Sequence, residues 1–137
     1  ATLQALEKGL RHYGRTSMGQ GRPRYWSWNG GGFDRPYLAR RALLHGLYPL
    51  AGMMRIEKPW LADDLYQVWC MGQNRARGSL DAVCDFLGID RSANPIGGGE
   101  VYDRWREGDL VSILDHCTDD IRVLREVHGR FRRAGWV

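Results

Sequence analysis

Two short patterns in the chain combine residue types that could carry out chemistry. The first is the run NGGGFD at residues 29–34, in which three glycines lead to an aromatic ring and a carboxylate. The second is His116-x-x-x-Asp120, whose two side chains share one face of a helix because they are four residues apart. Carboxylates are hard oxygen ligands for divalent cations, and imidazole exchanges a proton near neutral pH. One candidate chemistry is therefore a metal-binding carboxylate at the edge of a nucleic-acid cleft.

The glycines at residues 30–32 allow other interpretations. A Walker-type phosphate loop requires G-K-[ST] after its glycines, and Phe-Asp follows here. The dinucleotide fingerprint G-x-G-x-x-G is also unmatched, and Asp34 would place negative charge beside a pyrophosphate. A flexible strand-to-helix turn that binds nothing is the third interpretation, and the residues alone leave it open.

The last predicted helix separates its acids by face. One apolar stripe is expected to face the core and consists of Leu110, Ile113, Leu114, Cys117, Ile121 and Leu124. Asp115 and Asp119 point to the opposite side and are expected to face solvent, with Arg122 as the partner of Asp119. His116 and Asp120 lie at the margin of the stripe, where they could line a cleft. The alternative is an ordinary surface pair with a weak hydrogen bond.

Helices and loops must position these residues, and the pattern predicts few strands. Helices are predicted over residues 2–13, 35–47, 63–70, 79–87, 100–106 and 109–131, and short strands over 25–28 and 56–60. Ser79 and Asp109 are predicted N-caps, and Gly88 is a predicted helix stop. The chain therefore reads as one mostly helical α/β domain over residues 1–137. Two short strands do not make a stable sheet, although several of these helices need one to pack on.

Composition narrows the class of protein. The 137 residues carry a formal net charge of +4, which suits a polyanionic partner. No apolar run reaches the roughly 20 residues of a membrane span, so no membrane association is expected. The three cysteines are widely spaced and are expected to be buried thiols, neither a disulfide framework nor a zinc site. A reducing cytoplasm is the expected compartment.

Four motifs in order carry a family resemblance. Asn29-x-x-x-Phe33-Asp34, followed by Pro36 and a basic helix, resembles the second motif of the DEDD-type 3'-5' exonucleases. The most similar group is the predicted exonucleases related to the proofreading domain of family-B DNA polymerases. The segments SLDAVCDFLGI, GGGEVYDRWREGDL and ILDHCTDDIRVL follow at residues 79–89, 97–110 and 113–124, in the order of that group. Its third motif is Tyr-x-x-x-Asp, and this chain has His116-x-x-x-Asp120.

The resemblance implies a ribonuclease H-like fold and a metal-dependent nuclease that hydrolyses phosphodiester bonds at the 3' ends of nucleic acids, with DNA the expected substrate. Two Mg²⁺ or Mn²⁺ ions would activate a water molecule and stabilise the leaving 3' oxygen. By position, Asp34 and Asp120 are implied metal ligands, and His116 is the implied residue that orients or deprotonates the water. Phe33 would pack against the terminal base, and Asn29 would stand at the turn.

The family's first motif, Asp-x-Glu on the first strand, has no counterpart here. The 28 residues before Asn29 contain a single acid, Glu7. The expected fold is therefore the C-terminal, mostly helical portion of the exonuclease fold, without its first three strands. The chain would be a fragment, a partial domain completed by a second polypeptide or by self-association, or a degenerate homologue. In the last case the alternative function is a non-catalytic nucleic-acid-binding or partner subunit that kept the fold but lacks a complete metal site.

Basic residues supply candidate contacts to the nucleic-acid backbone. Arg40 and Arg41 lie on the predicted helix that follows Asp34, and they are the strongest candidates for contacting phosphates. Arginines near aromatic rings suit single-stranded nucleic acid, whose bases stack and whose phosphates pair with cations.

Overall fold

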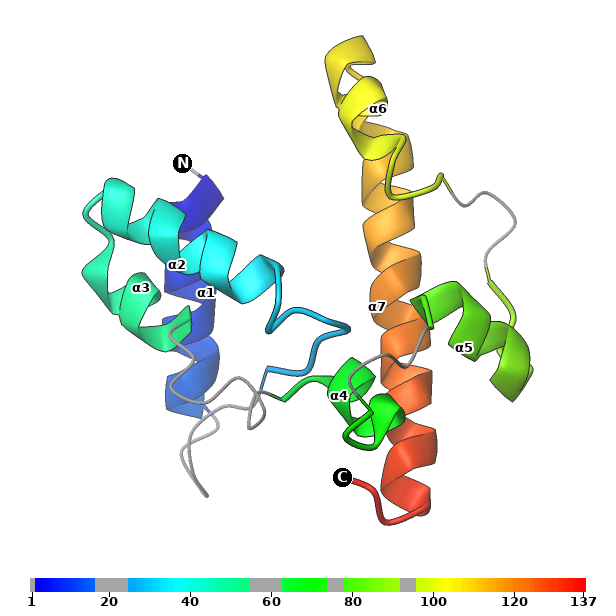
Figure 1. Cartoon of the computed structure of the whole chain (residues 1–137). Coiled ribbons are helices and arrows are strands. Elements are labelled where there is room, and N and C mark those ends of the chain that lie inside the picture. The colour runs from blue at the N-terminus through cyan, green and yellow to red at the C-terminus, as the bar shows by residue number, and fades with distance from the viewer. Residues whose placement is uncertain (1, 17–24, 55–62, 74–77, 92–95) are drawn as a thin grey trace. The chain divides into compact units, whose positions relative to one another are not determined.

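A computed structural model describes residues 2–16, 25–54, 63–73, 78–91 and 96–137. Seven helices lie in these segments (Figure 1). The chain divides into two compact units, Ala1–Trp69 and Cys70–Val137, and each is described by itself. The sequence predicted one domain over 1–137, and that prediction stays open. No helix of the described segments has both the length and the apolar character needed to cross a membrane.

The first unit is built from helices packed on a small apolar core. They are α1 (Thr2–Thr16), α2 (Asp34–Leu44) and α3 (Tyr48–Met54), and the unit also contains most of α4 (Leu65–Cys70). The buried core residues are Ala42, Leu50, Ala51 and Met54, and Leu3, Leu10 and Leu38 pack against them. Burial of this apolar surface holds α1 against α2 and α3.

Helix α3 corrects the sequence prediction, which extended one helix to residue 47 and placed no element directly after it. Helix α2 instead ends at Leu44, and Gly46 follows with φ of 68°. Glycine adopts this left-handed conformation without steric cost, so the chain turns here. Pro49 is the second residue of α3, where the first turn of a helix tolerates proline because its missing N–H would have no intrahelical partner.

A single parallel bridge joins Ser27 to Asp64. The Ser27 N–H donates to the carbonyl of Asp63, and the Leu65 N–H donates to the carbonyl of Ser27, both at 2.9 Å. The predicted strand over 25–28 is thus reduced to one bridging residue, and the predicted strand over 56–60 lies outside the described residues. Parallel pairing requires a crossover connection, and α2 and α3 lie within it.

The second unit contains α5 (Leu80–Leu87), α6 (Val101–Glu107) and α7 (Leu110–Arg133). Ser79 and Asp109 cap α5 and α7 by accepting hydrogen bonds from the backbone N–H groups of Ala82 and Ser112, each at 3.1 Å. Gly88 ends α5 in the left-handed conformation, with φ of 63°. All three local signals are confirmed. Figure 1 shows α5 beside α7, and a guanidinium hydrogen bond from Arg130 to the carbonyl of Leu87 joins the two helices.

The buried face of α7 differs from the predicted apolar stripe. The buried residues of α7 are Asp119, Val123, Val127 and Phe131, which recur every four residues. Four members of the predicted stripe are exposed: Leu110, Leu114, Cys117 and Ile121. The expectation that all three thiols are buried is therefore wrong for Cys117, whereas Cys70 and Cys84 are buried.

Candidate functional site

The turn that follows Ser27 is held by a buried carboxylate. Asp64 is 1% exposed, and its Oδ1 accepts hydrogen bonds from the N–H groups of Asn29 (2.7 Å) and Tyr66 (3.1 Å). Its Oδ2 accepts a third hydrogen bond, from the Gly31 N–H at 3.0 Å. Buried charges persist when they are hydrogen-bonded in this way. Asp64 therefore fixes the NGGGFD turn, and both of its oxygens are engaged by backbone donors.

Asn29 and Gly30 suit the geometry of this turn. Asn29 has φ of 57°, a left-handed conformation that asparagine tolerates better than most side chains. Gly30 is buried, and a Cβ atom placed on it would lie 2.5 Å from the Cβ of Ser27. Gly30 thus has a packing role inside the unit, which the sequence did not predict. The close approach of a nucleic-acid backbone, which the resemblance implied for the glycines, stays a prediction.

The turn places Phe33 and Asp34 at the start of α2. The ring of Phe33 is 70% exposed and stacks on Tyr37, with ring centroids 6.4 Å apart and an interplanar angle of 10°. Asp34 is the first residue of α2 and has an exposed side chain. An aromatic ring and a carboxylate are therefore both exposed at the start of α2, and their implied roles in base stacking and metal binding stay predictions.

The carboxyl group of Asp34 is electrostatically disfavoured in its charged form. Partial burial raises its pKa above the ordinary 3.8, the nearby charge of Asp64 raises it further, and a backbone hydrogen bond offsets part of the rise. Within the described residues, no cation pairs with Asp34 in compensation. Such a carboxylate gains stability from any positive charge that binds beside it.

The second pair of predicted site residues lies together on α7. The Nε2 atom of His116 is 3.5 Å from Oδ2 of Asp120. The His116 side chain is largely buried, and its Nδ1 has no hydrogen-bond partner among the described residues. The shared helix face predicted for this pair is therefore confirmed. A role for either residue in catalysis or metal binding stays a prediction.

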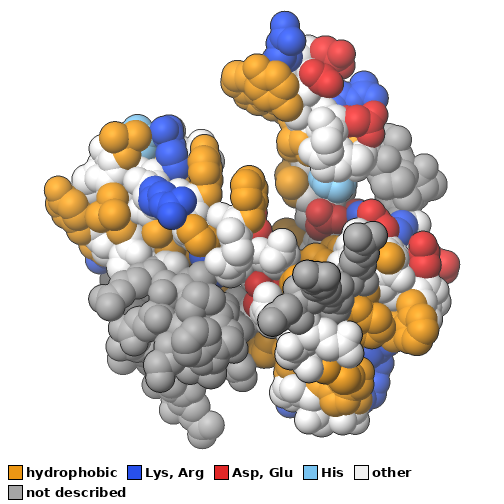
Figure 2. Space-filling model, viewed as in Figure 1, with side chains coloured by type: hydrophobic (Ala, Val, Ile, Leu, Met, Phe, Trp, Pro, Cys, Tyr) orange, Lys and Arg blue, Asp and Glu red, His pale blue; other side chains and the backbone are white. Residues whose placement is uncertain are grey.

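A guanidinium that no sequence motif singled out lies beside this pair. Arg91 follows α5 by four residues, and its Nη2 donates to Oδ1 of Asp120 at 2.8 Å. Its Nη1 lies 3.3 Å from Asp119, and its Nε lies 3.0 Å from Asp81 on α5. Figure 2 shows acidic, basic and histidine side chains adjoining one another over the middle of α7. Burial would lower the pKa of Arg91, but the hydrogen bond to Asp120 and the three carboxylate charges outweigh it and raise that pKa.

Asp119 corrects a sequence prediction, because it does not face solvent. Its side chain is 8% exposed and pairs with Arg91, and Arg122 donates to it at 2.9 Å. The predicted pairing with Arg122 is confirmed. The predicted exposure is wrong because Arg91, from the loop after α5, covers this side of α7.

The metal-binding capacity of the described residues is limited. No group of three or more His, Cys, Asp or Glu side chains within the described segments is arranged to hold a metal ion. Asp34 belongs to the first unit and Asp120 to the second, so each unit offers one of the two predicted ligands. Their carboxylate oxygens suit Mg²⁺ or Mn²⁺, but Asp64 has no free oxygen to add. A metal site that includes Asp34 and Asp120 stays a prediction.

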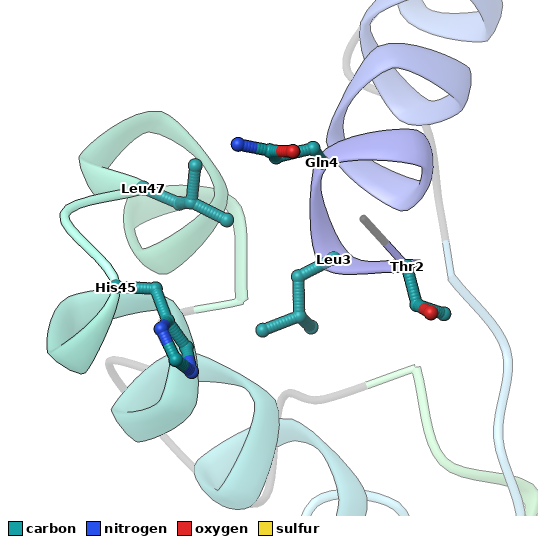
Figure 3. A pocket seen from close by; sticks show the side chains of 5 residues that line it. All are labelled: Thr2, Leu3, Gln4, His45 and Leu47. Carbon is teal, nitrogen blue, oxygen red and sulfur yellow. The ribbon is translucent and has the colours of Figure 1, made fainter.

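A pocket elsewhere in the first unit offers no comparable chemistry. It is lined by Thr2, Leu3, Gln4, His45 and Leu47. Figure 3 shows Leu3 of α1 and Leu47, from the loop before α3, extending into the space between those elements. His45 is the single titratable side chain in this lining, and none of the predicted site residues contributes to it.

The arginines predicted to contact phosphates lie on α2, the helix that begins at Asp34. Arg40 and Arg41 are both exposed. They lie six and seven residues after Asp34, at about 1.5 Å of helical rise per residue, or roughly 10 Å along the axis. Contact of these two arginines with phosphates stays a prediction.

A family model matches residues 4–125, and its description is a predicted 3'-5' exonuclease related to the exonuclease domain of PolB. The match spans most of the chain and includes both candidate patterns. The chain therefore belongs to this family of predicted 3'-5' exonucleases. Searches of curated proteins and of solved structures gave no match to the chain.

Proposed function

We propose that this chain is the C-terminal portion of a ribonuclease H-like exonuclease domain that hydrolyses phosphodiester bonds at DNA 3' ends with Mg²⁺ or Mn²⁺. The observation that carries this proposal is the environment of Asp34. Its exposed carboxyl group lies beside a buried negative charge, has a raised pKa, and has no cationic partner among the described residues. A divalent cation would relieve that unfavourable environment.

Other residues of the chain would supply the metal ligands, the base-stacking ring and the phosphate contacts. Asp34 and Asp120 would hold the metal ions, which when bound supply the positive charge that lowers the pKa of the attacking water and stabilises the leaving 3' oxygen. The exposed ring of Phe33 would stack on the terminal base, and the Asp64-anchored turn would fix its direction. Arg40 and Arg41 would pair with backbone phosphates.

His116 would accept the proton of the attacking water. An imidazole beside a carboxylate is the usual arrangement of a general base, because the carboxylate orients the ring and stabilises its cation. The 3.5 Å approach of Nε2 to Asp120 supplies the first part of this arrangement. Nδ1 is buried without a hydrogen-bond partner among the described residues, so it could accept the proton only where water reaches it.

One observation favours the non-catalytic alternative. Arg91 already neutralises Asp120, and the described residues contain no complete metal-binding group. A nucleic-acid-binding or partner subunit would need the basic and aromatic surface of α2 without a metal. Such a protein would bind DNA and leave it intact.

Cleavage and binding assays on one preparation separate these functions. A single-stranded DNA labelled at its 5' end is incubated with Mn²⁺ and with the chain completed by the polypeptide segment that bears the family's Asp-x-Glu motif, and the products are resolved as a ladder. The proposal predicts stepwise shortening from the 3' end that Asp34→Asn abolishes and Asp115→Asn, at an exposed position on α7, leaves intact. Binding without shortening supports the alternative function. Shortening that persists in Asp34→Asn contradicts the proposed site.

A further inference from the structure

The guanidinium of Arg91 stands where a cation would be needed beside Asp120. Its side chain is 15% exposed, and it lies within 3.3 Å of carboxylate oxygens from Asp81, Asp119 and Asp120. These residues come from α5 and α7, so the contact also ties the two helices together. A partly buried arginine among three carboxylates performs the neutralising role that a bound metal ion performs in an acidic site.

The hydrogen bonds of Arg91 are unequal. Nη2 makes a well-aligned bond of 2.8 Å to Asp120, whereas Nε and Nη1 make none that meets hydrogen-bond geometry despite their short ion-pair distances. Asp81 and Asp119 therefore attract the guanidinium by charge, whereas the hydrogen bond to Asp120 also fixes its orientation. Asp119 keeps a second partner, Arg122, if Arg91 withdraws.

The Asp120 side chain is 40% exposed, and each of its carboxylate oxygens lies near one partner. Oδ1 accepts a hydrogen bond from Arg91, and Oδ2 lies 3.5 Å from Nε2 of His116. A metal ion approaching Oδ1 would come within a few ångströms of the guanidinium, and two cations at that separation repel each other. The metal ion and Arg91 therefore compete for Oδ1.

We propose that Arg91 is a cationic latch on Asp120, so that a divalent cation binds this carboxylate tightly only when the guanidinium withdraws. The inference rests on the proposed function, because it takes Asp120 as a metal ligand. It adds a regulated step to that site. Whatever completes the metal site also has to draw Arg91 away from Asp120. The isolated chain is thereby held in a weakly metal-binding state.

Mn²⁺ binding to the full chain tests the latch directly, with free Mn²⁺ measured by electron paramagnetic resonance. Arg91→Met removes the charge and keeps much of the volume, and it is expected to tighten Mn²⁺ binding about tenfold to hundredfold, the scale of one charge-assisted hydrogen bond. Arg122→Met is the matched control because Arg122 contacts Asp119 and not Asp120. Adding Asp120→Asn to Arg91→Met should remove the gain.

Three outcomes would overturn the latch: unchanged or weaker binding by folded Arg91→Met, a gain that survives Asp120→Asn, or no Mn²⁺ binding by any variant. If Arg91→Met does not fold, the reactivity of Arg91 in the unsubstituted chain tests the latch instead. Phenylglyoxal modifies accessible guanidiniums, and mass spectrometry locates the product. Mn²⁺ should accelerate modification of Arg91 and leave exposed Arg132 unchanged, whereas an unchanged Arg91 rate overturns the latch.

These readouts are independent of nuclease activity. A chain that shortens DNA in an Asp34-dependent manner, but whose Arg91 is equally reactive with and without Mn²⁺, retains the proposed function and loses the latch. A chain that shows the competition at Asp120 but never cleaves DNA retains the latch as a metal switch and loses the exonuclease assignment.

Discussion

Replacing Asp64 with alanine should unfold the NGGGFD turn and destabilise the first unit. The carboxylate accepts three backbone N–H bonds, at 2.7, 3.0 and 3.1 Å, from Asn29, Gly31 and Tyr66. A hydrogen bond to a charged group contributes about 1.5–3 kcal/mol. Water can reach part of the opened turn, because Asn29 is exposed. The expected loss in unfolding free energy is therefore below the simple total, at about 3–5 kcal/mol.

Urea unfolding followed by tryptophan fluorescence measures this loss, because Trp28 lies beside the turn and contacts Tyr66 edge-on at 5.7 Å. Amide hydrogen exchange supplies a local readout, and exchange at Asn29 and Gly31 should accelerate in Asp64→Ala. The isosteric Asp64→Asn keeps one oxygen that accepts hydrogen bonds from the turn, but its NH₂ group would face a backbone N–H donor on the other side. The loss in unfolding free energy should therefore be intermediate. Asp115→Ala is the exposed control. A loss of less than about 1 kcal/mol with unchanged exchange would refute the role of Asp64.

Four further predictions address the candidate site. Asp34→Asn should raise the melting temperature at pH 7. Because the pKa of Asp34 is raised in the folded chain, the protein loses stability as the pH rises from 3.8 through the folded-state pKa, and asparagine avoids this loss. The melting temperatures of the two proteins should agree below pH 3.8, and a lower melting temperature of Asp34→Asn at pH 7 would contradict the prediction. Arg40→Ala combined with Arg41→Ala should weaken single-stranded DNA binding and flatten its salt dependence in fluorescence anisotropy, and an unchanged salt slope would exclude α2 from the interface. Asp119→Asn should destabilise the second unit by about 1–3 kcal/mol in urea unfolding, because the buried side chain loses the charge that pairs with Arg91 and Arg122; a neutral effect would show that these ion pairs do not stabilise the unit. In the site completed by the missing Asp-x-Glu segment, His116→Ala should slow DNA shortening by roughly 10²–10⁴ with Mn²⁺ affinity little changed, and full activity would remove His116 as the base.

The sequence alone determined the features that depend on neighbours along the chain. The caps at Ser79 and Asp109 and the stop at Gly88 follow from hydrogen bonds and backbone conformation within four residues, and all three were confirmed. The proximity of His116 and Asp120 follows from helical spacing in the same way. The order of the motifs also identified the family, because it is a property of the sequence itself.

Asp64 was predictable only in part. An Asp-Asp pair before an apolar run signals a helix start, and α4 does begin at Leu65. Its hydrogen bonds to residues more than 30 positions earlier in the chain carry no local signature. The parallel bridge to Ser27 brings the two segments together, and neither segment shows that pairing by itself.

Tertiary structure decided which face of α7 is covered. The helical pattern offered an apolar stripe through Leu110, Leu114 and Ile121, yet these side chains are exposed and Asp119 is buried. Helical periodicity fixes which residues share a face, but burial depends on which other element packs there. Arg91, which follows α5, places a positive charge beside Asp119, and this charge compensates for the burial of that carboxylate on α7.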